Sequence, residues 1–261
     1  MGTPRRVSIA GAAVAVAGAS AVAARIGLTR QAAIARRRIG KPLGELAPDA
    51  DRVWRKSQNG EQLELLLLGD SIAAGLGAER PKDTLGARVA KGLARALHRP
   101  VRLRTVAIVG SESSALGAQV DSLPAGYRPD VAIIVVGGND VTHRVPVSTA
   151  VGHLREAIIR LQERGTIVVV GTCPDLGALR PVPQPLRALG SRLSRQLAAA
   201  QAEAAHDAGA HAVSLRRAVG PFFITQPDEM FSLDRFHPSA LGYRRTADAL
   251  VPVVLDAFDW A

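Results

Sequence analysis

The sequence has a single cysteine, Cys173, in 261 residues, so the chain cannot form an intrachain disulfide. Aromatic residues make up only 3% of the chain, too few to build a base-stacking surface for single-stranded nucleic acid. The net charge of +10 is also unevenly distributed, because residues 1–41 carry eight basic residues and no acidic residue. The remaining 220 residues have a net charge of only +2, so we expect no nucleic-acid partner.

Several motifs of cofactor and metal sites are missing as well. The chain has no Walker lysine, no His-Glu-x-x-His and no zinc-binding spacing of cysteine and histidine. Gly75-Leu76-Gly77 does not extend to a dinucleotide-binding pattern, because Arg80 occupies the position of the third glycine. The Gly-x-Ser-x-Gly turn of the α/β-hydrolase fold is absent too. We therefore expect neither a cofactor nor a metal.

The N-terminal region has the layout of a targeting segment. Arg5 and Arg6 precede Val7–Ala24, a stretch of 18 uncharged residues rich in alanine, valine and glycine. A cleaved signal peptide, a signal anchor and an interfacial helix are three alternatives, and the basic segment Arg25–Lys41 favours the cytoplasmic side of a membrane. We expect residues 1–40 to associate with the membrane or to direct export to the cell envelope, with a cytoplasmic location as the alternative.

The rest of the chain is expected to form one domain. Residues 41–60 contain two prolines and mixed charge, which indicates a linker or a surface wrap before a domain at 61–261. Short apolar segments then alternate with amphipathic helical ones, the pattern of a three-layer α/β/α sandwich with a five-stranded parallel sheet. The expected strands are Leu65–Leu68, Val101–Val109, Val131–Val136, Thr166–Val170 and Ala210–Leu215.

Polar residues follow these strands, at the edge of a parallel sheet where ligands bind. Ser71 follows the first strand, Gly110 the second and Asn139 the third. A hydrolytic serine needs a base near its hydroxyl, a carboxylate that orients the base, and donors for the developing oxyanion. The base for Ser71 is therefore expected among the six histidines.

Two histidines have an aspartate three residues earlier in an expected loop. They are His237, which follows Asp234, and His143, which follows Asp140. His237 is favoured, because Pro238 restricts its loop and the next residue can cap the last helix. His143 remains the alternative base.

Taken together, the motifs resemble those of the GDSL or SGNH-hydrolase family of serine esterases, lipases and acyltransferases, and more narrowly the GDSL-type esterases of actinobacteria. The matching segments are Gly69-Asp70-Ser71-Ile72, Gly110, Gly137-Gly138-Asn139-Asp140 and Asp234-Arg235-Phe236-His237. The resemblance implies a flavodoxin-like sandwich with Ser71 as nucleophile, His237 as base and Asp234 as its orienting carboxylate. It also implies an oxyanion hole formed by the N–H groups of Ser71 and Gly110 and by the side-chain amide of Asn139.

These residues predict a serine-dependent carboxylic ester hydrolase that works through an acyl-enzyme on Ser71. The expected substrates are small-molecule, lipid or carbohydrate esters. The same residues would serve an acyltransferase that moves the acyl group to a sugar or another alcohol. A non-catalytic lipid-binding or glycan-binding module is the third alternative, because a fold alone does not fix a function.

Overall fold

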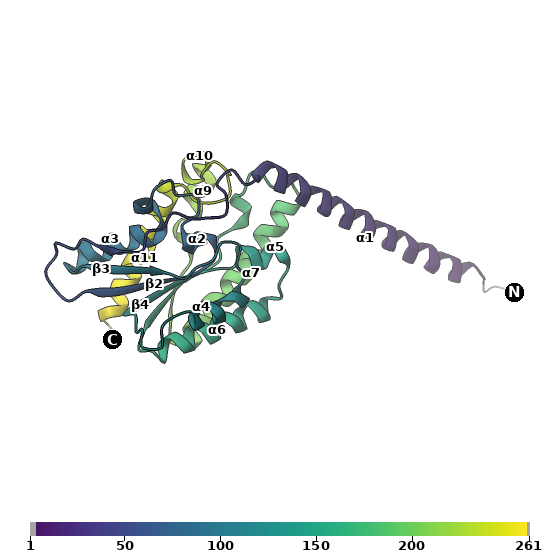
Figure 1. Cartoon of the computed structure of the whole chain (residues 1–261). Coiled ribbons are helices and arrows are strands. Elements are labelled where there is room, and N and C mark those ends of the chain that lie inside the picture. Colours follow the sequence, from purple (N-terminus) through teal and green to yellow (C-terminus); the bar gives the residue numbers. More distant parts are fainter. Residues whose placement is uncertain (1–3, 260–261) are drawn as a thin grey trace.

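The protein folds around one six-stranded sheet, with the N-terminal helix projecting from it (Figure 1). The computed structural model describes the backbone of residues 4–259, and within that range all side chains except those of residues 4–19, 21 and 259. The strand order is β1-β3-β2-β4-β5-β6, and every neighbouring pair is parallel except β1 with β3. The strands are β1 (Val53–Trp54), β2 (Leu63–Gly69), β3 (Val101–Thr105), β4 (Val131–Val135), β5 (Ile167–Gly171) and β6 (His211–Val213).

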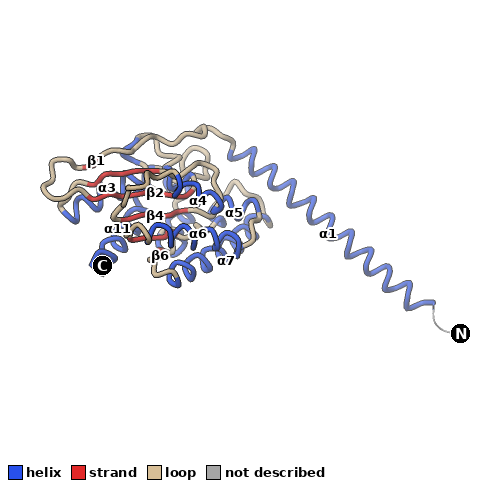
Figure 2. Tube along the Cα trace, turned by 60° about the horizontal axis from the view of Figure 1, so that its bottom comes forward, coloured by secondary structure: helices blue, strands red, loops and turns tan. Residues whose placement is uncertain are grey.

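Strand β2 is buried on both faces, which explains its run of leucines. Leu65 and Leu67 point into one hydrophobic core, and Leu66 and Leu68 point into the core on the opposite face. The first core is closed by α3 (Leu85–Leu97) and α11 (Ala240–Asp259). The second is closed by α4 (Leu116–Asp121), α6 (Val147–Gln162) and α7 (Leu186–Asp207), completing three layers (Figure 2).

Short helices occupy the connections between the layers. They are α2 (Ser71–Ala74), α5 (Gly138–His143), α8 (Leu215–Ala218), α9 (Gly220–Thr225) and α10 (Pro227–Met230), with 3₁₀ turns at η1 (Pro81–Asp83), η2 (Ser113–Ala115) and η3 (Leu176–Ala178). The predicted α/β/α sandwich is therefore confirmed, with six strands in place of the expected five. The additional strand, β1, comes from the segment expected to be a linker or wrap.

Strand β1 pairs with β3 at the edge of the sheet, although its own sequence gives no strand signal. The N–H of Leu103 donates to the carbonyl of Arg52 at 3.0 Å, and the Asp51 carboxylate accepts the N–H of Thr105 at 2.8 Å. Two residues are too few for an alternating pattern, so the strand can be recognised only from its pairing with β3. The strand predicted at Val101–Val109 is β3 in the structure, and it ends earlier, at Thr105.

The N-terminal segment forms one long helix, α1 (Pro4–Ile39), whose first half extends away from the domain (Figure 1). Residues 1–3 of the predicted targeting segment lie outside the described residues. Across residues 4–259, no helix combines the length and the apolarity needed to cross a membrane.

The order of the strands changes direction at β2. The chain runs from β2 to its neighbour β3 and then crosses back to β4 on the other side of β2. The connection after β2 runs through α3 on one face of the sheet, whereas the connection after its neighbour β4 runs through α6 on the other face, so a crevice opens between the carboxyl ends of these two strands. Ser71 lies at this point, directly after β2.

Candidate active site

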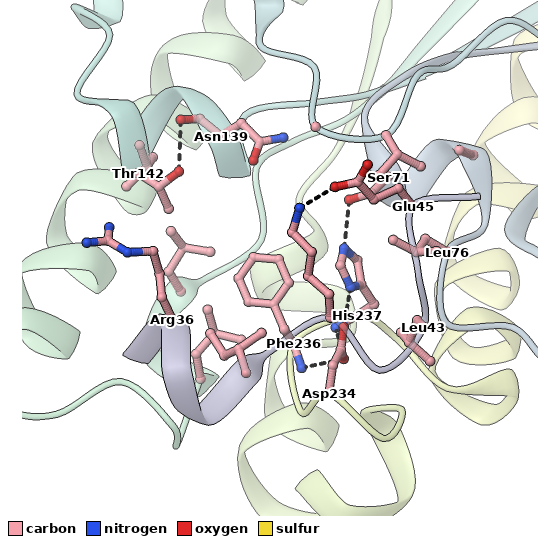
Figure 3. A pocket seen from close by; sticks show the side chains of 18 of the residues that line it. Arg36, Leu43, Glu45, Ser71, Leu76, Asn139, Thr142, Asp234, Phe236 and His237 are labelled. Carbon is pink, nitrogen blue, oxygen red and sulfur yellow. Dashed lines mark hydrogen bonds and ion pairs between the residues drawn. The ribbon is translucent and has the colours of Figure 1, made fainter. Parts of the chain in front are cut away.

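Three side chains form a continuous hydrogen-bond chain at the carboxyl end of β2 (Figure 3). The Oγ of Ser71 lies 2.9 Å from Nε2 of His237, and Nδ1 of His237 lies 2.5 Å from Oδ2 of Asp234. A hydroxyl placed against an imidazole that a carboxylate orients is the arrangement that activates a serine for nucleophilic attack. The structure thus brings together the three residues that the motifs predicted.

The backbone around Ser71 is fixed by local contacts. Asp70 caps α2, because its Oδ1 accepts the N–H of Ile72 at 2.9 Å. Gly77 has a φ of +105°, and a Cβ there would lie 2.5 Å from the carbonyl oxygen of Pro238 and 3.0 Å from Cβ of His237. Only glycine allows the loop after α2 to lie this close to the loop that carries His237.

Burial and hydrogen bonding set opposite charge preferences for two carboxyl groups. Burial alone raises the pKa of Asp234, but the imidazole and N–H of His237 and the N–H of Phe236 outweigh it and hold the pKa below its usual value. Asp234 is therefore a carboxylate at neutral pH, as orientation of an imidazole requires. Burial raises the pKa of Asp70 to about 6, despite the N–H that this carboxyl accepts from Ile72. That environment and its capping contact favour a structural role for Asp70.

Three residues that can donate hydrogen bonds, Ser71, Gly110 and Asn139, line the same cavity as the Ser71 hydroxyl. Among the described residues, no acceptor takes the N–H groups of Ser71 and Gly110. Gly110 has a φ of +84° and nothing within 4 Å of where a Cβ would be, so its backbone is open to the cleft. The Nδ2 of Asn139 donates to the carbonyl of Ser111 at 2.8 Å and, as Figure 3 shows, points toward the side where Ser71 lies. Its second N–H remains for a ligand.

The alternative histidine has a different partner. Nδ1 of His143 lies 2.7 Å from Oε1 of Glu112, and the imidazole is exposed. The aspartate three residues earlier, Asp140, accepts the N–H of Ser113 with both carboxylate oxygens at 3.1 Å. The Asp140/His143 spacing therefore builds neither an Asp–His pair nor a contact with Ser71, because both members are used to fix the loop after β3.

Ser71 lies in the walls of two cavities. The larger, of about 1400 Å³, also contains Gly110, Asn139 and His237. Four arginines line it, namely Arg25 and Arg36 of α1, Arg187 of α7 and Arg144, which follows α5. None of them has an ion-pair partner in the described part of the chain. The smaller cavity, of about 70 Å³, is lined mainly by apolar side chains that include Leu179, Phe223 and Phe231.

Two buried glutamines support the site and were not anticipated from the sequence. Gln119 accepts the N–H of Gly69 and donates to its carbonyl, both at 2.8 Å, which fixes the end of β2. Gln201 accepts the N–H of Cys173 and donates to the carbonyl of Val136, so it joins the ends of β4 and β5. A glutamine on the apolar face of an expected helix is the sequence signal that could have revealed them. Gln201, for example, lies one helical turn after Leu197 and one turn before Ala205.

The described side chains show no group of three or more histidine, cysteine, aspartate and glutamate residues that could hold a metal ion. Cys173 is buried against Gln201, and burial raises the pKa of its thiol. It therefore lacks the exposed thiolate that a nucleophilic cysteine requires.

Comparison with known proteins agrees with the geometry. Residues 67–245 match the model of the GDSL-like Lipase/Acylhydrolase family. The chain is 39% identical over 267 residues to the GDSL-like esterase Rv1075c of Mycobacterium tuberculosis, covering 97% of this chain and 85% of that protein.

Solved structures show the same fold at low sequence identity. An acetylxylan esterase of Geobacillus stearothermophilus, Axe2, superposes with a TM-score of 0.58 at 20% identity over 75% of this chain and 95% of its own. The esterase EstA of a Pseudoalteromonas species superposes with a TM-score of 0.57 at 19% identity over 74% of this chain and 98% of its own. The resemblance predicted from the motifs is confirmed, and the protein is a hydrolase that belongs to the GDSL-like lipase/acylhydrolase family.

Proposed function

We propose that the protein hydrolyses small-molecule carboxylic esters through an acyl-enzyme on Ser71. Ester hydrolysis in general follows from family membership, and the hydrogen-bond chain from Ser71 through His237 to Asp234 supports the serine mechanism. The relatives support the substrate class, since one is named an esterase and another an acetylxylan esterase.

In the first half-reaction, the Oγ of Ser71 attacks the ester carbonyl while Nε2 of His237 takes the hydroxyl proton. Asp234 holds the imidazole so that Nδ1 carries the other proton, and its negative charge stabilises the imidazolium that forms. The carbonyl oxygen becomes an oxyanion, which the N–H groups of Ser71 and Gly110 and the amide of Asn139 stabilise. The bond to the alcohol breaks, and His237 donates its proton to the leaving alkoxide.

In the second half-reaction, water replaces the alcohol. His237 removes a proton from the water as it attacks the acyl carbonyl, and the same three donors stabilise the second oxyanion. The bond to the Oγ of Ser71 then breaks, and His237 returns the proton to the serine. The products are the free acid and the regenerated enzyme.

A fluorophosphonate probe, which reacts with activated serines, tests this assignment on the full chain. Ser71→Ala and His237→Ala should each abolish labelling and the hydrolysis of p-nitrophenyl acetate. The matched controls are Ser114→Ala and His143→Ala, because both residues are exposed and neither contacts Ser71. Full labelling in His237→Ala together with its loss in His143→Ala would show that the base is misassigned.

We further propose that residues 1–40 bring the domain formed by residues 61–261 to a membrane or to the cell envelope. The eight cations and absence of acids in residues 1–41 support this location, because each basic residue near an anionic membrane surface contributes about 1 kcal/mol. Fractionation of cells expressing the full chain and a deletion of residues 2–24 tests the proposal. Equal recovery of both forms in the cytosol would contradict it.

A further inference from the structure

One wall of the larger cavity belongs to the N-terminal helix. Leu28, Ala32, Ala35 and Ile39 of α1 all line the cavity that contains Ser71. Their spacing of four, three and four residues places them on one face of the helix. Ala35 is buried and the other three side chains are half-buried, although all four residues precede the domain at residues 61–261 in the sequence.

Two polar contacts hold this end of α1 against the domain. The side chain of Gln31 donates to the carbonyl of Gln184 at 2.7 Å and accepts the N–H of Leu186 at 2.9 Å. Two turns later, Nη1 of Arg38 donates to the carbonyl of Pro181 at 3.3 Å. The apolar face between these contacts joins none of the three clusters of buried hydrophobic residues in the described chain. It therefore faces the cavity.

The opposite wall is mainly apolar, with Arg187 as its charged member. It is formed by α7 and the loop before it, and the residues that line the cavity there include Leu179, Val182, Leu186, Leu189 and Leu193. Figure 3 shows the ring of Phe236 between the end of α1, which carries Arg36, and His237. Both walls line the same cavity as Ser71, so the groove between them is continuous with the space at the Ser71 hydroxyl. The whole cavity measures about 1400 Å³, more than the roughly 300–1,000 Å³ of an ordinary ligand pocket.

We infer that the groove between α1 and α7 binds an alkyl chain of the ester substrate. The inference rests on the proposed ester hydrolysis at Ser71 and adds a substrate class, esters with an extended apolar arm. The second cavity beside Ser71 measures only about 70 Å³, so a long chain fits the groove and not this cavity. The alkyl chain can belong to the acyl group or to the alcohol, since either would bury its methylenes against the same apolar face of α1.

Filling the groove tests the inference. Ala32→Trp places a large ring on the apolar face of α1 that lines the cavity. Ala33→Trp is the matched control, because Ala33 is the next residue in α1 and does not line the cavity. Each variant is compared with the wild type on p-nitrophenyl acetate and decanoate, which vary the acyl arm, and on ethyl and decyl acetate, which vary the alcohol arm. The readout is the long-to-short ratio of kcat/KM in each pair.

Each buried methylene is worth about a factor of four in binding. The ratio should therefore fall at least about tenfold in Ala32→Trp, in whichever pair carries the alkyl arm, and stay within about twofold in Ala33→Trp. Unchanged ratios in both pairs, or equal loss in both variants, would overturn the inference. Failure of the proposed function is distinguishable, because the wild type would then leave all four esters intact or Ser71→Ala would still hydrolyse them.

Discussion

Replacing Asp234 by asparagine should abolish most activity without removing the serine or the histidine. In the native site Oδ1 of Asp234 accepts the N–H groups of Phe236 and His237, both at 2.9 Å, while Oδ2 faces Nδ1 of His237. An asparagine has one acceptor oxygen, which those two N–H groups occupy. Its NH₂ group then faces Nδ1, so the proton of the imidazole moves to Nε2, and Nε2 no longer accepts the proton of Ser71.

The expected loss in kcat is large. In serine enzymes with this arrangement the substitution costs about 10⁴-fold, which corresponds to about 5 kcal/mol of transition-state stabilisation. Hydrolysis of p-nitrophenyl acetate measures the rate, and thermal unfolding shows whether the variant keeps the native fold. Asp228→Asn, at an exposed aspartate on α10, is the matched control and should retain full activity. A folded Asp234→Asn variant with more than about a tenth of the wild-type kcat would refute the proposed role of Asp234.

Three other substitutions test the surroundings of the site. Asn139→Ala should lower kcat about 10²–10³-fold, because a donor to the oxyanion is lost, whereas a loss below tenfold would remove Asn139 from the oxyanion hole. Gly77→Ala should reduce both the melting temperature and kcat, since its Cβ would collide with the loop carrying His237; unchanged values would show that this close approach is dispensable. Asp70→Asn should flatten the pH dependence of stability. Burial raises the folded-state pKa of Asp70 from 3.8 to about 6, so ionisation above pH 6 destabilises the native chain, and this effect disappears toward pH 4. Between pH 4 and pH 8, urea unfolding should show the variant gaining about 2 kcal/mol relative to the wild type, and parallel profiles would contradict the burial argument.

The sequence predicted the elements whose signals are local. The run Leu65–Leu68 ends in glycine and is buried on both faces, so its assignment as a central strand holds in the structure. The parallel arrangement follows from the alternation of strands and helices, and it brings Ser71, Gly110 and Asn139 to one edge of the sheet. The contact with His237 could be proposed because the aspartate and the histidine lie in one short loop.

The features that the sequence did not predict depend on contacts between distant segments. Strand β1 has two residues and is defined by its pairing with β3. The position of α1 against α7 depends on Gln31, whose partners lie more than 150 residues later in the chain. Such contacts leave no periodic pattern in either segment, so helix or strand signals cannot reveal them.

The hydrogen bond between Ser71 and His237 joins residues 166 positions apart. Closing a loop of that length costs entropy, and it requires that both residues have already been synthesised. While the chain is being synthesised, Ser71 emerges long before its partner, and its hydroxyl has no base to activate it. The esterase is therefore assembled only when the segment before α11 docks beside β2, so a nascent chain on the ribosome cannot hydrolyse the esters of the cell that makes it.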